Sequence, residues 1–352
     1  MVSLYHYVIL LSNLPESSIT DRVREGKKES FTMKYLSFFL IALLLCVSCQ
    51  QPSDNAPPTI TGIELKTGTR YCVEKGTSEP APAILVKYSD GSSVEAVGSV
   101  SSTESGFADI TYEGFKIEDG AYIYDEALSE LPDTLGEEYD SKYVLLKAKD
   151  GGHKIEEAIY EDGRSAALSI TAKDLYILGE DGAEISVEII NMTRVIDVKN
   201  GSVTLDGIKF TSVFKRNIAE NEVSLIVANA GQAFVKNCDF TGYNVVSLID
   251  QKPDTCWIAI YSEKGGTLSL TNNVFKEMFV FEQTEEQDVI KNNVFKNAYV
   301  CLLYPDNIVE GNVFENDSLG YGAICVDGVF NETTKAYLES KNKNCTVVQL
   351  VE

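Results

Sequence analysis

A six-residue phrase recurs five times in the C-terminal half of the chain: an aliphatic residue, any residue, Asn or Gly, two further residues, and Phe. A phrase that recurs along a chain indicates one structural unit stacked on copies of itself. Five copies in order, three of them sharing Asn, Val and Phe, make a chance origin the weaker explanation. The copies are Leu205–Phe210, Val235–Phe240, Leu270–Phe275, Ile290–Phe295 and Val309–Phe314.

The spacing of the phrases gives the size of the unit. Phe275, Phe295 and Phe314 follow one another at 20 and 19 residues, whereas the two earlier intervals are 30 and 35 residues. We therefore expect coils of about 20 residues, with loops inserted into the two earlier coils. Apolar residues alternate with other residues, as at Leu268 and Leu270, and alternation is typical of β-strands. A leucine-rich repeat has a similar length, but no spaced run of leucines precedes the Asn.

Stacked coils place equivalent positions above one another, about 4.8 Å apart. We expect the aliphatic and Phe positions to point inward, and the Asn or Gly to form a bend that needs a left-handed backbone. The first Asn of the phrase can also share a ladder of side-chain amide hydrogen bonds. The predicted inner ladder consists of Phe210, Phe240, Phe275, Phe295, Phe314, Asn237, Asn272 and Asn292.

Residues 160–345 resemble the right-handed parallel β-helix superfamily, the pectate-lyase-like fold. The likeness rests on the phrases and on two upstream segments, residues 175–185 (LYILGEDGAEI) and 198–207 (VKNGSVTLDG). The resemblance implies a right-handed parallel β-helix, which we assign to residues 151–345. It implies little about activity, because this architecture carries lyases, hydrolases, adhesins and inert stalks.

The segment before the repeats has β patterns of a different kind. Asp90-Gly91, between Ile84–Tyr88 and Ser93–Glu95, predicts a hairpin. The segment ITGIELKTGTRY, followed by VKYSDGSSVEAV, resembles the sequence of a bacterial immunoglobulin-like domain. We therefore assign residues 59–150 to an immunoglobulin-like β-sandwich, which makes the whole chain mainly β.

The junction of the two predicted domains is less regular. Asp125–Leu131 predicts a short helix. Lys154–Tyr160 has helical spacing and can form a cap on the first coil; alternatively, the same segment can form the last strand of the preceding domain. His153 is interpreted as a solvated turn residue.

The N-terminal region predicts export. Lys34 and the apolar run up to Val47 have the form of a secretion signal, residues 33–48, that is too short to span a bilayer comfortably. The run ends in Val47-Ser48-Cys49, which resembles a bacterial lipobox and implies lipidation of Cys49. A plain signal peptide or a membrane anchor is the alternative.

Residues 1–32 are interpreted as a mis-assigned start or a disordered segment, and residues 49–58 as a tether. The expected location is the cell envelope, on the surface or periplasmic side of the outer membrane.

Charge and cysteine usage narrow the classes of partner. The net charge of −23 disfavours nucleic acid, anionic headgroups and acidic polysaccharides, and leaves neutral glycans, cationic surfaces and proteins. Membrane contact is expected through the lipid anchor. The cysteines lack CxxC spacing, so we expect no zinc site and mostly buried free thiols.

Residues suited to catalysis are sparse. A glycosidase needs two carboxylates held close together, and the chain has no Asp-Asp pair. No cofactor is expected; calcium is possible at acidic loops, although none has the spacing of a known calcium loop. Aromatic rings suit stacking on sugars, and the interrupted phrases gather several polar and aromatic residues. The candidate ligand-binding residues are Trp257, Tyr261, Tyr243, Arg216, Asp250 and Asp254.

These observations favour an envelope lipoprotein that acts as a non-catalytic binding or adhesion module, with a glycan or a surface protein as ligand. A polysaccharide lyase or glycoside hydrolase built on a β-helix is the first alternative. A structural surface stalk is the second.

Overall fold

The fold is known from a computed structural model, in which the described residues are mainly β-strand. It describes residues 57–350 except 67, 69, 78–80, 101–102, 156–165, 189–193, 214–222, 243–256, 264, 283–286, 304–306, 316–323 and 328–330.

The chain divides into two compact units, residues 1–60 with 88–90, and residues 61–87 with 91–352. In the described part of the first unit, Ser89 N–H donates to Thr59 O at 2.8 Å, and Thr59 N–H donates to Ser89 Oγ at 3.1 Å. The sheets and the site discussed below belong to the second unit, apart from the end residues of β1 and β3.

The described residues before position 125 form two small sheets. One has the strand order β1-β3-β4, and β3 and β4 form the predicted antiparallel hairpin, which is thereby confirmed. The other has the order β2-β7-β6-β5, with β6 antiparallel to β7 and β2 parallel to it. Their bounds are β1 (Ile60–Leu65), β2 (Tyr71–Glu74), β3 (Ala83–Tyr88), β4 (Ser93–Val97), β5 (Ser99–Val100), β6 (Gly106–Tyr112) and β7 (Phe115–Tyr124).

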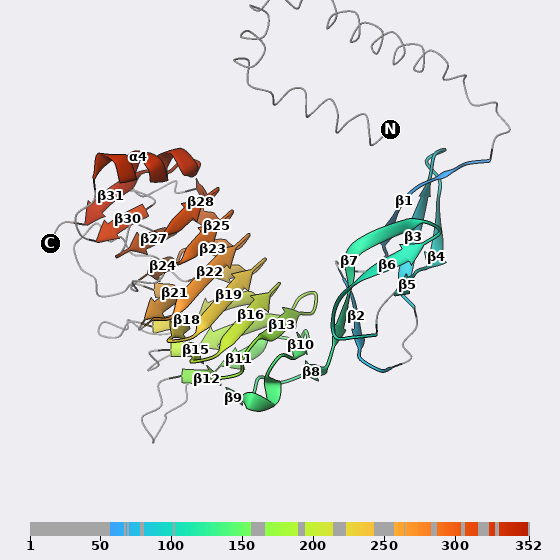
Figure 1. Ribbon diagram of the computed structural model, residues 1–352, viewed down its shortest axis with the longest axis horizontal. Coiled ribbons are helices and arrows are strands. Elements are labelled where there is room, and N and C mark those ends of the chain that lie inside the picture. The colour runs from blue at the N-terminus through green and yellow to red at the C-terminus, as the bar shows by residue number, and fades with distance from the viewer. Residues whose placement is uncertain are drawn as a thin grey trace, which may run out of the picture. The chain divides into compact units, whose positions relative to one another are not determined.

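From residue 126 onward, the described strands form three parallel sheets, named A, B and C here. From β10 to β30, each successive turn of the chain adds one strand to each of the three sheets (Figure 1). This arrangement is compatible with a β-helix. Sheet A contains β8 (Glu126–Leu128), β10 (Tyr143–Leu146), β13 (Leu175–Gly179), β16 (Ser202–Asp206), β19 (Gln232–Lys236), β22 (Thr267–Thr271), β25 (Val289–Lys291) and β28 (Ile308–Glu310). Sheet B contains β11 (His153–Ile155), β14 (Glu184–Glu188), β17 (Lys209–Val213), β20 (Asp239–Thr241), β23 (Val274–Lys276), β26 (Val294–Lys296) and β29 (Val313–Glu315). Sheet C contains β9 (Thr134–Leu135), β12 (Ala166–Ile170), β15 (Arg194–Lys199), β18 (Val223–Asn229), β21 (Trp257–Glu263), β24 (Phe279–Glu282), β27 (Tyr299–Leu302), β30 (Ile324–Asp327) and β31 (Val347–Leu350).

The described helical segments are short: a 3-10 turn, η2 (Glu137–Tyr139), and α4 (Glu332–Lys341). The N-terminus of α4 is capped by Asn331, whose side chain accepts the Thr334 N–H at 2.9 Å. Within the described residues, no helix is both long and apolar enough to cross a membrane. The predicted secretion signal and Cys49 lie outside these residues.

The parallel sheets begin before residue 151, because β8, β9 and β10 already pair within them. The helix predicted at Asp125–Leu131 is wrong, since Glu126–Leu128 is strand β8. Leu128 is buried and pairs with Leu146, so parallel pairing outweighs the local helical preference. Of the helical pattern predicted at Lys154–Tyr160, the first two residues belong to β11, and the rest lies outside the described residues.

The Phe positions of the phrase form a continuous column inside the three sheets. Successive ring centroids lie 4.7–5.0 Å apart, with interplanar angles of 2° to 14°. The rings are buried, as are the aliphatic residues of the phrase, which pair in register along sheet A. The column consists of Phe210, Phe240, Phe275, Phe295 and Phe314.

The third position of the phrase forms the bend. Its residues have positive φ angles of 53° to 70°, in the left-handed region that Gly and Asn tolerate best. They are Gly207, Asn237, Asn272, Asn292 and Gly311.

The amide ladder predicted for Asn237, Asn272 and Asn292 is wrong by one position. These three side chains are exposed, whereas the following position is buried and forms the ladder. Asn293 Oδ1 accepts from the N–H and the Nδ2 of Asn273, at 2.8 and 3.1 Å. The ladder continues through Asn312 to Asn342 with hydrogen bonds of 2.8 to 3.0 Å. A bend residue turns its side chain outward, so the ladder has to run through its neighbour.

Cys72, Cys238, Cys325 and Cys345 are free thiols, as predicted. Cys238, Cys301 and Cys325 are buried, while Cys72 and Cys345 are half-buried. Cys238 occupies a ladder position, where its Sγ lies 3.4 Å from the Ile208 N–H and its own N–H donates to Asn273 Oδ1 at 2.9 Å. Cys256 lies outside the described residues.

Candidate functional site

Four of the six candidate residues named from the sequence, Arg216, Tyr243, Asp250 and Asp254, lie outside the described residues. Trp257 and Tyr261 lie on β21 of sheet C and pair in register with Val223 and Val227 of β18. Ile260 is fully buried, and Tyr261 is half-buried.

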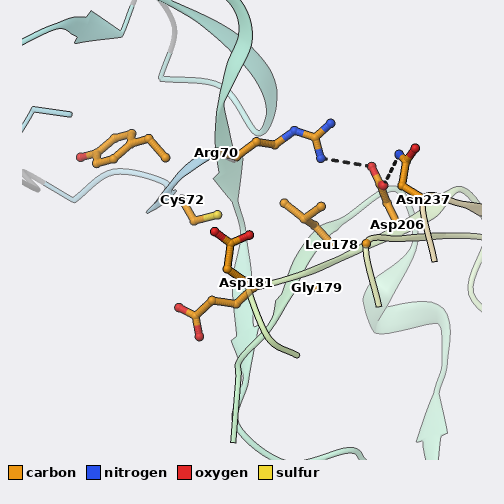
Figure 2. A pocket seen from close by; sticks show the side chains of 10 residues that line it. Arg70, Cys72, Leu178, Gly179, Asp181, Asp206 and Asn237 are labelled. Carbon is orange, nitrogen blue, oxygen red and sulfur yellow. Dashed lines mark hydrogen bonds and ion pairs between the residues drawn. The ribbon is translucent and has the colours of Figure 1, made fainter. Parts of the chain in front are cut away.

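A hollow of ≈ 620 Å³ lies between β2 and the C-terminal ends of the central strands β13 and β16 of sheet A (Figure 2). One wall comes from β2 and the residue before it. The other wall comes from the ends of β13 and β16 and from the turns that follow β13, β16 and β19. The polar side chains that line the hollow are Arg70, Tyr71, Cys72, Glu180, Asp181, Asp206 and Asn237.

The centre of this wall is the buried carboxylate of Asp206, which is 1 % exposed. Tyr176 OH donates to Oδ2 at 2.6 Å, and Asn237 Nδ2 donates to Oδ1 at 2.7 Å. Arg70 Nη1 lies 3.3 Å from Oδ2, and Lys236 Nζ lies 3.7 Å from it. A buried carboxylate is tolerated when it is paired and hydrogen-bonded in this way. The same contacts fix the orientation of Arg70 and Asn237, as Figure 2 shows.

An aromatic cluster supports the hollow from the side. Tyr143 and Tyr176 are register partners on sheet A, and their rings stack at 5.5 Å. Phe107 and Tyr122, from β6 and β7, pack on them with centroid distances of 5.2 Å (Phe107–Tyr176) and 6.0 Å (Tyr122–Tyr143). Arg70 lies over the Phe107 ring at 5.0 Å, a cation–π contact. The cluster therefore holds Arg70 against the carboxylate that it pairs with.

The two tyrosine hydroxyls of this cluster act as neutral donors. Burial raises the pKa of Tyr122 and of Tyr176 above the ordinary range, and the hydrogen bond to Asp206 raises that of Tyr176 further. Tyr122 OH donates to Val144 O at 2.9 Å. Both hydroxyls thus keep their protons at neutral pH and stabilise this wall of the hollow by donating hydrogen bonds.

The part of this wall that follows β13 is acidic. Glu180 Oε2 accepts the Ala148 N–H at 2.8 Å, and its Oε1 lies 3.2 Å from Lys147 Nζ. Asp181 is exposed at the turn after β13. Burial, followed by the charge of Glu180, raises the pKa of Cys72 to about 11. Cys72 therefore stays a thiol at neutral pH and is a poor nucleophile.

The chemistry that this arrangement supports is hydrogen bonding to a polar ligand. Arg70 and Asn237 offer donors, while Asp181 and Glu180 offer acceptors. The described residues include no group of three or more His, Cys, Asp or Glu side chains that can hold a metal ion. Asp288 is fully buried, and its carboxylate accepts from Leu268 N–H and Ser262 Oγ at 2.7 and 2.8 Å.

His153 is a further correction. The predicted solvated turn residue is 2 % exposed and belongs to β11 of sheet B. Its Nε2 lies 2.7 Å from Lys147 O, and its Nδ1 has no partner among the described residues. Its strand pairs with β14, where Ile185 is the register partner of His153, so pairing between coils places the imidazole in the interior.

Comparison with models of known protein families, with curated proteins and with solved structures gives no match. The class of the protein therefore follows from its own structure: it is a mainly β protein with long parallel sheets that are compatible with a β-helix.

Proposed function

We propose that this protein is a non-catalytic binding module, and that its ligand is a glycan held in the hollow between β2 and sheet A. The observation that carries the proposal is the network around Asp206. Arg70 and Asn237 are already held in place by this carboxylate, at 3.3 and 2.7 Å. Polar groups that are fixed before binding lose little entropy when a ligand arrives. Sugar hydroxyls both donate and accept, so they suit a wall that offers both kinds of group.

The charge of the hollow selects among glycans. Glu180, Asp181 and Asp206 contribute three carboxylates, against the single cation of Arg70 in the lining. The whole chain also carries a net charge of −23. A uronate or a sulfated sugar would meet this field with like charge. The ligand class that fits is therefore a neutral sugar or an amino sugar.

Binding without cleavage is favoured by how the central carboxylate is used. Both oxygen atoms of Asp206 are engaged by donors, Tyr176 OH and Asn237 Nδ2, so neither is free to attack a sugar or to transfer a proton. If the protein cleaves glycans, it is a lyase or a hydrolase. If it binds no ligand, a structural stalk is its remaining role.

Replacing Arg70 tests the proposal. Screening the soluble protein from residue 50 onward on an array of neutral, amino and acidic glycans is expected to give neutral or amino sugars as ligands. Arg70→Gln is then expected to weaken binding at least about tenfold in calorimetry, because the wall loses its principal donor. Arg194→Gln is the matched control, since this arginine pairs with Asp197 and Glu263 on sheet C, away from the hollow.

Two results would contradict glycan binding at the hollow. One is binding that is equally strong in wild type and Arg70→Gln. The other is the release of new reducing ends or unsaturated products, which would establish the enzymatic alternative. Circular dichroism of both variants checks that they keep the β fold.

The wider organisation that we propose is an envelope lipoprotein: a lipid on Cys49, a tether over residues 49–58, an immunoglobulin-like domain, and a right-handed parallel β-helix. It is supported by the sequence Val47-Ser48-Cys49, by the antiparallel pairing of β6 with β7, and by the parallel sheets from β8 onward. A left-handed winding in a crystal structure would contradict the last part.

Lipidation has a direct measurement. Mass spectrometry of the full chain produced in a bacterium is expected to show a mature N-terminal peptide that begins at a lipid-modified Cys49. Cys49→Ala is expected to abolish the modification and to release the protein from the membrane fraction. A mature chain that keeps residues 33–48, or that begins at an unmodified residue, would refute the anchor.

A further inference from the structure

We infer that the ligand continues beyond the hollow along the outer face of sheet A, where Phe234 stacks against a second part of it, so that the ligand is a neutral oligosaccharide chain. This inference rests on the proposed function and adds a second subsite to it.

The first observation is the exposure of Phe234. Its ring is 42 % exposed, whereas its neighbours Ala233 and Val235 are buried inside the sheet. Among the residues whose side chains the structure describes, Tyr337 of α4 is the other large aromatic exposed to this degree, and its hydroxyl donates to Glu310 at 2.7 Å. Single exposed apolar residues are common, so the surroundings of this ring decide what its exposure means.

The second observation is the row of residues to which Phe234 belongs. In-register pairing places Tyr143, Tyr176, Thr204, Phe234 and Ser269 in one column on the outer face of sheet A. The first two are packed under Phe107. Thr204 and Ser269 are half-buried and flank the exposed ring. An aromatic ring between two hydroxyl groups matches a sugar, which has an apolar face and a polar rim.

The third observation is continuity with the hollow. Thr204 and Asp206 lie on β16, and Phe234 and Lys236 lie at the paired positions of β19. Lys236 Nζ is 3.7 Å from Asp206 Oδ2 and lies 5.0 Å from the centroid of the Tyr176 ring. Two residues along a strand span roughly 7 Å, and adjacent strands are about 4.8 Å apart. The ring is therefore within one or two sugar units of the hollow.

The charge of the row decides between occupants. Thr204, Phe234 and Ser269 form an uncharged strip on a chain of net charge −23, which suits an uncharged ligand. A protein partner would need roughly 800 Å² of contact with an apolar centre, and one ring between hydroxyl groups does not provide that.

The test compares short and long ligands. The soluble protein from residue 50 onward is titrated calorimetrically with neutral oligosaccharides of glucose, xylose, mannose and N-acetylglucosamine, each as the dimer and the hexamer. For the sugar that binds, the hexamer is expected to bind at least about tenfold more tightly than the dimer. Phe234→Ala is expected to remove this gain and to leave dimer affinity within about twofold.

The controls separate the second subsite from the hollow. Tyr337→Ala, at the other exposed aromatic, is expected to leave both affinities unchanged, and Phe234→Trp is expected to restore hexamer binding. Arg70→Gln is expected to weaken the dimer and the hexamer alike. If Arg70→Gln weakens binding but Phe234→Ala does not affect the hexamer, the second subsite is refuted and the hollow stands. If no sugar in the panel binds, both proposals fall.

Discussion

Asn293→Ala is expected to lower the free energy of unfolding by about 3–5 kcal/mol. Its amide accepts from the Asn273 N–H and Nδ2, and donates to Leu270 O and Asn312 Oδ1 at 3.0 Å each. Alanine leaves several of these buried groups without a partner, and each such group costs roughly 1–3 kcal/mol. Guanidinium denaturation followed by circular dichroism measures the change.

The neighbouring residue provides the control. Asn292 is exposed and has a φ of 56°, and its place is taken by Gly207 and Gly311 in two other phrases. Asn292→Gly is therefore expected to change stability by less than about 1 kcal/mol. Equal losses for the two variants would show that the ladder does not stabilise the coils.

Phe295→Ala is expected to cost about 3–5 kcal/mol, the range measured when a buried Phe is truncated in other proteins. The ring lies between Phe275 and Phe314, with centroid distances of 5.0 and 4.8 Å, and it is fully buried. Truncation leaves a cavity inside a stack whose coils cannot easily collapse, because each is held by its neighbours.

The exposed Phe234 is the matched control for this variant, because the same Phe→Ala change on the outer face removes little buried surface. We expect Phe234→Ala to cost less than about 1 kcal/mol. A loss at Phe295 as small as that at Phe234 would refute the packed column. The control also establishes that Phe234→Ala is folded in the binding experiment.

The sequence predicts the stacked Phe and aliphatic positions well, because equivalent positions of a repeated motif lie above one another when its copies stack. It misplaces the ladder because two adjacent Asn residues suit a bend equally well in isolation. The information to decide was present in Val309–Phe314, where Gly311 takes the first position and Asn312 the second. A glycine can form the bend, but it has no amide to contribute to a ladder.

The hollow could not be predicted in the same way. Arg70 and Asp206 are 136 residues apart, and no periodicity links them. Asp206 carried a weak signal, since it follows the aliphatic position of the first phrase and alternation turns it outward. Whether an outward carboxylate is solvated or buried depends on the cover that β2 supplies, and that is a property of tertiary packing. The strand at Glu126–Leu128 escaped prediction for the same reason.

Asn342 determines where the stack of coils ends. It forms the C-terminal cap of α4, and its Oδ1 accepts from the N–H and Nδ2 of Asn312. Its Nδ2 donates to Val309 O and to Leu338 O, both at 2.8 Å, so both amide hydrogens are used within its own end of the molecule. A further coil from another molecule could not join this ladder unless α4 first gave up its bond. The ladder thus ends within the molecule, because its last amide, Asn342, is bonded to α4 and has no hydrogen left to donate to another coil.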